Sequence, residues 1–247
     1  YHQRTSRIYT DYGLMTADAE ICRDVHTVFL QLTSLGKVTK LHRLMQSPFS
    51  MVSGMHAKIA REMEQAAKGK PARIVAKMNG LVEPEMIGKL YQASQAGVKI
   101  DLIVRGMCSV RPGVKGLSEN IRVHSVIGRF LEHHRVFYFD NSSAEPELYL
   151  SSADWMERNL FKRVEIAFPI LDKKIRTQLI EQLMAYVSDT AQSWRLMDDG
   201  SYVRLAGGGK PVQSALLEQL TGADEPEKLK SKSAMLPRMA KRPRKKK

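Results

Sequence analysis

Apolar and polar residues follow one another along this chain with the two periods of an α/β protein. Apolar positions recur every three to four residues in the expected helices and form short continuous or alternating runs in the expected strands. The expected helices cover 19–32, 51–68, 84–96, 172–190 and 211–220, and the expected strands cover 7–12, 72–78, 99–104, 121–125, 130–139, 147–151, 163–169 and 201–205. The strand at 72–78, the helix at 84–96 and the strand at 99–104 follow closely enough to form a crossover unit with two parallel, buried strands.

Local signals mark the ends of several elements. Asp18 is placed to cap the first helix, Pro84 suits the first turn of its helix, and Gly97 suits the exit. Residues 33–46 are expected to form a connector. The strand within 7–12 has no candidate partner nearby, so we expect it to complete a unit whose earlier part is missing.

These patterns predict three parts. Residues 1–45 are expected to be the end of one α/β half plus a connector, 46–205 a second α/β domain, and 206–247 a flexible basic tail rich in Lys, Pro and Ser. A hydrophobic content of 43% is enough for a core. No window approaches about 18 uncharged apolar residues, so we expect no transmembrane helix.

The first residues of the chain and its cysteines indicate the cellular compartment of the protein. The chain begins at Tyr1 without a charged segment followed by an apolar one, so we expect a piece of a longer protein and no signal peptide. Cys22 and Cys108 are the two cysteines, which indicates neither a disulfide framework nor a zinc site. A reducing cytoplasm fits this usage.

The net charge of +13 is unevenly distributed. Residues 222–247 hold ten basic and three acidic residues, so a net +7 belongs to the tail. The remaining +6 favours an anionic ligand, because such a field concentrates anions near the surface. We therefore expect no specific nucleic-acid binding and, through the tail, weak association with an anionic membrane surface at most.

Candidate chemistry lies in one β-type run. His133 and Arg135 are two positions apart, so in a strand both side chains project to the same face. An imidazole that relays a proton beside a guanidinium that holds anionic oxygens suits a phosphate. The plainer interpretation is a surface histidine, a solvated arginine and a turn beginning at Asp140.

A longer pattern supports the phosphate interpretation. His133, Arg135 and Asp140 form H-x-R-x4-D, and Ser151-Ser152-Ala153-Asp154 follows one hairpin later. This arrangement resembles the H-x-K-x4-D and G-S-x-N signature of the phospholipase D superfamily, with Arg for Lys and Asp for Asn.

An ordered set of blocks resembles the C-terminal part of bacterial polyphosphate kinase more closely and covers about residues 1–205. The blocks are Tyr9-Thr10-Asp11-Tyr12 with Leu14-Met15-Thr16-Ala17-Asp18, Lys77-Met78-Asn79-Gly80-Leu81-Val82, Ile103-Val104-Arg105-Gly106-Met107-Cys108, Arg129-Phe130-Leu131-Glu132-His133 and Leu150-Ser151-Ser152-Ala153-Asp154-Trp155-Met156. The resemblance implies a phospholipase D-like mixed sheet flanked by helices, with residues 1–45 ending a first catalytic half and 46–205 forming the second.

The resemblance also implies roles for single residues. The family forms polyphosphate from ATP, reversibly, through a phosphohistidine that would lie upstream of Tyr1, and His2 and His42 stand in the wrong contexts to replace it. His133 matches the second active-site histidine, which binds ATP phosphate and acts as general acid or base. Arg105 matches an ATP-phosphate ligand, and Tyr9 matches a tyrosine that contacts the nucleotide.

Other residues are weaker candidates. Hydrogen bonds that orient His133, or contacts with polyphosphate, are considered for Arg135, Asp140, Ser151, Ser152 and Asp154. A polyphosphate path is considered for Arg158 and Arg163, whose plainer role is solvated charge. His134 receives no role. Magnesium is implied by ATP chemistry and by the family, yet no carboxylate cluster designates a site for it. No GxxxxGK[ST] motif is present, so ATP is not held by a P-loop.

The family implies ATP, ADP and polyphosphate as substrates and a homo-oligomer as the assembly. This chain alone is expected to be inactive, because the phosphorylated histidine would be missing. Two alternatives stay open: a phospholipase D-like phosphodiesterase or nuclease that needs no ATP, and a basic module that binds polyanions without turnover.

Overall fold

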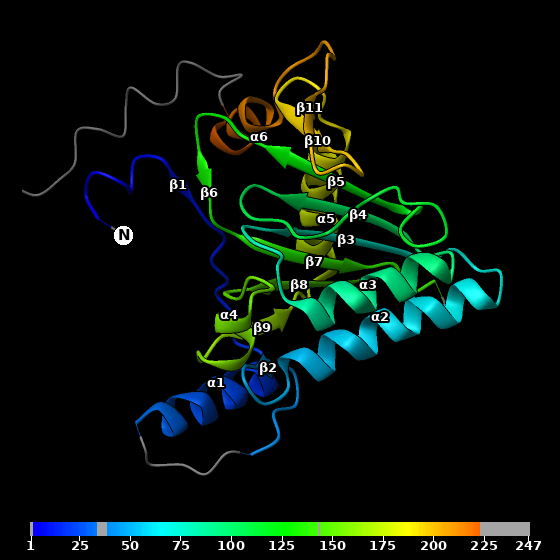
Figure 1. The fold of residues 1–247 in the computed structure, drawn as a ribbon. Helices are drawn as coiled ribbons and strands as arrows, with labels where there is room; N and C mark the ends of the chain where they lie inside the picture. Colours follow the sequence, from blue (N-terminus) through cyan, green and yellow to red (C-terminus); the bar gives the residue numbers. More distant parts are fainter. Residues whose placement is uncertain (1, 34–38, 143, 223–247) are drawn as a thin grey trace, which may run out of the picture.

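One mixed β-sheet with helices against both faces forms the body of the molecule (Figure 1). The computed structural model describes residues 2–33, 39–142 and 144–222. Its helices are α1 (Ala19–Leu32), α2 (Met51–Ala67), α3 (Pro84–Gln95), α4 (Glu157–Phe161), α5 (Lys173–Ser188) and α6 (Val212–Thr221). Its strands are β1 (Tyr9–Thr10), β2 (Met45–Gln46), β3 (Arg73–Met78), β4 (Lys99–Val104), β5 (Ile121–Val126), β6 (Leu131–Glu132), β7 (Arg135–Phe139), β8 (Glu147–Ser151), β9 (Ile166–Pro169), β10 (Ser193–Leu196) and β11 (Tyr202–Arg204).

The sheet is parallel in its centre and antiparallel toward both edges. Among the described residues its strand order is β11-β10-β5-β4-β3-β7-β8-β9-β2. β3, β4 and β5 run parallel, and the other neighbours are antiparallel. The predicted parallel pair is confirmed, with Ile74 opposite Ile100. The predicted α/β class, a mixed sheet flanked by helices, is confirmed as well.

Each face of the sheet has its own apolar core. α2 and α3 cover one face, where Met55, Ile59 and Leu90 pack on Ile74 and Ala76. On the opposite face, α5 and α6 cover a second core that contains Val75, Ile103 and Leu183. Figure 1 shows α2 and α3 in front of the sheet and α5 passing behind it. Because β3 is covered on both faces, it reads as an apolar run rather than an alternating one.

The helix ends follow the sequence signals. The Asp18 carboxylate accepts hydrogen bonds from two main-chain N–H groups of the first turn of α1, and Asp172 accepts one at the start of α5. Pro84 lies in the first turn of α3, and Gly97 follows that helix with a φ of 92°. Such a positive φ costs glycine little, because it has no Cβ.

The structure corrects three predictions about the strands. The strand expected within 7–12 is only Tyr9–Thr10, and it does have a partner, since it pairs in parallel with Leu131–Glu132. The continuous strand expected over 130–139 is broken, because His133 and His134 lie between β6 and β7. The strand expected over 163–169 begins only at Ile166.

Three short elements were not predicted: β2, α4 and β10. β2 has two residues and α4 has five, too few for a periodic pattern to develop. Among the described residues, no helix combines the length and the apolar character needed to cross a membrane. The flexible tail was predicted over 206–247. Its residues from 223 onward lie outside the described residues, whereas within 206–222 helix α6 packs Val212 and Leu216 into the second core. The domain boundaries at 45 and 205 stay predictions.

Candidate functional site

Loops from four strands meet at one end of the sheet. Asn79 follows β3 and Arg105 follows β4, so the carboxyl ends of two parallel strands bring them to the same edge. β7 runs antiparallel to β3, which places its start, next to His133, at that edge too. β8 pairs antiparallel with β7, and its carboxyl end leads to Asp154. The edge therefore gathers residues that lie up to 75 positions apart in sequence.

His133 lies at the centre of this edge. Its Nδ1 lies 3.1 Å from Oδ2 of Asp11, and both side chains are 38% exposed. Its main-chain N–H donates to the Thr10 carbonyl at 2.9 Å, and the Tyr9 ring meets the imidazole edge-on with centroids 5.5 Å apart. A neutral imidazole that donates Nδ1–H to a carboxylate keeps Nε2 as a proton acceptor. The contact with Asp11 therefore favours the tautomer that a general base needs.

Arg135 lies beside the His133 ring and is held there by Asp154. Its Nη1 lies 3.3 Å from each ring nitrogen and donates to the His133 carbonyl at 2.8 Å. Its Nε and Nη2 donate to the two Asp154 oxygens at 3.2 and 2.8 Å. Oδ1 of Asp154 also accepts from the main-chain N–H groups of Asn79 at 2.6 Å and Gly80 at 3.2 Å. One buried carboxylate thus ties the ends of β3 and β8 to the guanidinium.

Arg105 reaches the same place from β4. Its Nε donates to Oδ1 of Asn79 at 2.6 Å and to the Glu132 carbonyl at 2.8 Å. Within the described residues its terminal amino groups make no hydrogen bond, so they can hold anionic oxygens. The next residue, Gly106, leaves room for this arrangement: a Cβ there would lie 2.5 Å from the Asn79 carbonyl oxygen.

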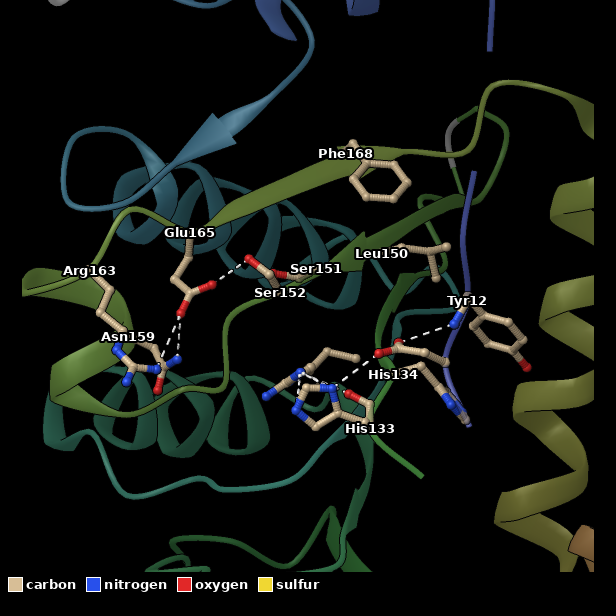
Figure 2. A pocket seen from close by; sticks show the side chains of 12 residues that line it. Tyr12, His133, His134, Leu150, Ser151, Ser152, Asn159, Arg163, Glu165 and Phe168 are labelled. Atoms are coloured by element: carbon tan, nitrogen blue, oxygen red, sulfur yellow. Dashed lines mark hydrogen bonds and ion pairs between the residues drawn. The ribbon is translucent and has the colours of Figure 1, made fainter. Parts of the chain in front are cut away.

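Two hollows open on either side of His133 and Asp11, which line both. One, of about 440 Å³, is also lined by His2, Thr5 and Tyr9. The other, of about 420 Å³, is drawn in Figure 2. Its lining residues are Asp11, Tyr12, His133, His134, Arg135, Leu150, Ser151, Ser152, Asn159, Arg163, Glu165 and Phe168. His133 and Asp11 therefore border two spaces with room for a ligand.

The candidate serines line the second hollow without touching His133. The Ser152 hydroxyl donates to Glu165 at 2.5 Å, and the Ser151 hydroxyl donates to the Ile166 carbonyl at 3.0 Å. Asn159 also donates to Glu165, at 2.9 Å. Figure 2 shows these groups on the side of the hollow opposite Tyr12. These side chains therefore form part of the wall of the hollow. Among the residues predicted to support His133, Asp154 does so indirectly, because it holds Arg135 beside the imidazole ring.

The structure brings together most of the predicted residues and leaves one apart. Tyr9, Arg105, His133 and their supporting residues converge at this edge. Asp140 lies beyond the far end of β7, where its carboxylate accepts from the Tyr138 hydroxyl at 2.7 Å. The residues that sequence reasoning missed are Asp11 and Asn79, although each stands inside a block that carried the family resemblance.

His134 lines the second hollow and is buried beside Tyr12, close to the charges of Lys77 and Arg135. It is 5% exposed, and its ring centroid is 4.4 Å from that of Tyr12. Burial, with help from the nearby positive charge of Lys77, lowers the pKa of His134 well below its usual value. The imidazole is therefore neutral at pH 7. Among the described residues, no group of three or more His, Cys, Asp or Glu side chains is placed to hold a metal ion.

Comparison with known proteins places this site in context. Residues 44–215 match the family model described as polyphosphate kinase C-terminal domain 2, and residues 1–40 match C-terminal domain 1 of the same family. The polyphosphate kinase of Burkholderia multivorans is 56% identical over 218 residues, which cover 88% of this chain and 31% of that protein. The polyphosphate kinase of Paraburkholderia phytofirmans is 57% identical over 220 residues, covering 88% and 32%.

A solved structure agrees with these matches. The crystal structure of polyphosphate kinase from Porphyromonas gingivalis superposes with a TM-score of 0.80 at 36% identity, covering 85% of this chain and 33% of that one. The chain therefore spans about a third of the length of the relatives it matches.

Proposed function

This chain belongs to the polyphosphate kinase family, and on that premise we propose that it supplies part of a site that transfers the γ-phosphoryl group of ATP reversibly to a polyphosphate chain. We place the phosphohistidine of this reaction on a histidine outside residues 1–247. In the first step the bond from γ-phosphorus to the ADP oxygen breaks and a bond from phosphorus to that histidine nitrogen forms. In the second, the phosphorus–nitrogen bond breaks and a terminal polyphosphate oxygen takes the phosphoryl group.

The observation that carries the proposal is the placement of His133 between Asp11 and two arginines. The Asp11 carboxylate holds Nδ1, which leaves Nε2 to exchange a proton with a phosphate oxygen during transfer. Phosphoryl transfer spreads negative charge over the equatorial oxygens, and fixed cations stabilise that charge. Arg105 and Arg135 supply such cations, since one donates to the carbonyl of Glu132 and the other to the carbonyl of His133.

Tyr9 offers an aromatic face for the nucleotide base. It lines the hollow of about 440 Å³ with His133 and Asp11, so a base stacked there would bring its phosphates toward the imidazole. Magnesium supplies charge neutralisation when it binds with ATP. Because the described residues offer no cluster for it, we propose that its ligands lie elsewhere in the full-length protein.

The function is tested with the full-length protein that contains this chain. With ADP and polyphosphate, luciferase should detect ATP, and His133→Ala should abolish most of that turnover. The exposed His26 on α1 is the matched control, and His26→Ala should behave like the parent. Cleavage of a phosphodiester without ATP formation would instead support a phospholipase D-like enzyme, and polyphosphate binding without either reaction would support a polyanion-binding module.

Arg105→Lys separates recognition of ATP from folding. Lysine keeps the charge and loses the planar fork. Loss of one charged hydrogen bond of ~1.5–3 kcal/mol should raise the apparent KM for ATP by roughly 10- to 150-fold. Arg122→Lys is the control variant. The Nε of Arg122 also donates to a fixed acceptor, Asp101, but Arg122 lies on β5 away from the site. An unchanged KM in Arg105→Lys would contradict the assignment.

A further inference from the structure

A cluster of buried polar groups lies directly behind His133. The preceding residue, Glu132, is 5% exposed, and its carboxylate has two partners. Lys77 of β3 lies 3.0 Å from Oε2, and the Tyr186 hydroxyl of α5 donates to Oε1 at 2.5 Å. The Lys77 ammonium also lies 4.8 Å from the centroid of the Tyr186 ring. Charged groups are rarely buried this deeply unless they are paired, as Lys77 and Glu132 are here.

The ionisation states of the cluster are consistent with one another. Burial lowers the pKa of Lys77, and the Glu132 carboxylate opposes that change. Burial and the same carboxylate raise the pKa of Tyr186, so the phenol keeps its proton and donates it. Removing one member of a buried ion pair costs about 3–5 kcal/mol, while apolar replacements of the whole pair are often neutral. Stability alone therefore gives little reason to keep the cluster.

Helix α5 makes a second contact with the site, one turn away. Gln182 and Tyr186 are four residues apart and so lie on one helix face. The Gln182 Oε1 atom accepts from the Tyr12 hydroxyl at 2.7 Å. Tyr12 directly follows Asp11, and its main-chain N–H donates to the Asp11 carboxylate at 3.1 Å. One helix face therefore contacts the sequence neighbours of both Asp11 and His133.

The backbone alone fixes this pair weakly. Asp11 and His133 come from segments 122 residues apart, which are joined by the two-residue strands β1 and β6. A pair of strands this short is marginal unless other elements support it. Each segment has a side chain that hydrogen-bonds to α5: Glu132 beside His133, and Tyr12 beside Asp11.

We propose that the face of α5 formed by Gln182 and Tyr186 is the positioning element of the site, which sets the separation and orientation of His133 and Asp11. Tyr186 acts through Glu132, whose carbonyl also receives Arg105, and Gln182 acts through Tyr12. His134 packs between the two contacts, 4.4 Å from the Tyr12 ring and 6.2 Å from the Tyr186 ring. This inference rests on the proposed function, since it assigns the pair a shared chemical task.

The first test is Tyr186→Phe in the full-length protein, which removes one hydroxyl and keeps the ring under Lys77. A displacement of the pair by a fraction of an ångström should lower kcat by about tenfold while the KM for ATP stays at the parent value. Tyr149→Phe is the matched control: its ring also lies near a lysine, Lys58, and its hydroxyl also donates to a glutamate, but it lies on the opposite face of the sheet. Equal kcat values for the two variants would overturn the proposal.

A second readout does not require turnover. Diethyl pyrocarbonate modifies exposed neutral imidazoles, and peptide fragmentation distinguishes His133 from its buried neighbour. We expect the rate of His133 modification at one fixed pH to change in Tyr186→Phe and in Gln182→Met, and to match the parent in Tyr149→Phe. An unchanged rate in both α5 variants would refute the positioning role even if the parent had no kinase activity. A changed rate in a protein whose parent form lacks kinase activity would refute only the proposed function.

Discussion

Replacing Asp154 tests the buried charge pair that holds the site together. In Asp154→Asn, Oδ1 can still accept from the N–H groups of Asn79 and Gly80. The new amide NH2, however, faces the Arg135 guanidinium at the position where Oδ2 now lies 2.8 Å from Nη2. Both side chains of the pair are only 9% exposed, so water cannot replace the lost partner. The variant leaves a buried positive charge opposite a hydrogen-bond donor.

The size of the effect follows from this geometry. Breaking a buried ion pair by removing one partner costs about 3–5 kcal/mol, and Arg135→Met should cost a similar amount because it leaves Asp154 without its cation. The double variant Arg135→Met with Asp154→Asn leaves no isolated charge. We therefore expect its cost to fall below the sum of the two single costs by roughly 0.5–3 kcal/mol.

Urea-induced unfolding followed by far-ultraviolet circular dichroism measures these differences. With a slope of about 2 kcal/mol/M, each single variant should lower the midpoint by roughly 2 M. Glu157→Gln is the control, because the Glu157–Lys162 pair is exposed to water and should leave the midpoint where it was. Additive single costs, or a change in Asp154→Asn no larger than in the control, would refute the account of the pair.

Three further predictions concern the neighbouring residues. Gly106→Ala places a Cβ against a main-chain oxygen and should destabilise the fold by about 1–3 kcal/mol, whereas Gly88→Ala, where a Cβ meets nothing within 4 Å, should not; thermal unfolding decides, and equal shifts would contradict this. Asp11→Asn keeps a hydrogen-bonding group beside His133 but removes the charge, so kcat should fall by roughly 10²-fold at saturating substrate, and an unchanged kcat would exclude the pairing from catalysis. Because burial lowers the pKa of His134 below 6.5, the unfolded chain binds a proton that the folded chain does not, so stability should fall as pH drops below 6.5; the urea midpoint should depend less on pH in His134→Phe.

Local signals account for the parts of the fold that the sequence predicts. α1, α2 and α3 begin and end within one residue of the predicted bounds, because a capping carboxylate, a proline and a glycine each act over a single turn. β10 was missed because it has four residues with no clear alternation, and it depends on pairing with β5. Pairing partners far away in sequence leave no local pattern.

In the site as well, a contact between residues close in sequence was predicted and a contact between residues far apart was missed. His133 and Arg135 were expected to meet because they are two positions apart, and they do meet, although His133 lies outside the strand. Asp140 became a candidate through the spacing of the H-x-R-x4-D pattern, and it ranked lower because it begins a turn. At about 3.3 Å per residue, the five positions after Arg135 carry it roughly 16 Å along β7, away from the site. Asp11 was missed because 122 residues separate it from His133.

The two-residue pairing of β1 with β6 has a consequence for biosynthesis. Asp11 leaves the ribosome 122 residues before His133 and 170 residues separate Tyr12 from Gln182. At about 5–20 residues per second, roughly 6–24 s pass between synthesis of Asp11 and His133, and longer before α5 can support them. The segment around Tyr9 must therefore wait for its β6 partner while the 122 residues up to His133 are made, so that the edge holding His133 is among the last parts of this region to form.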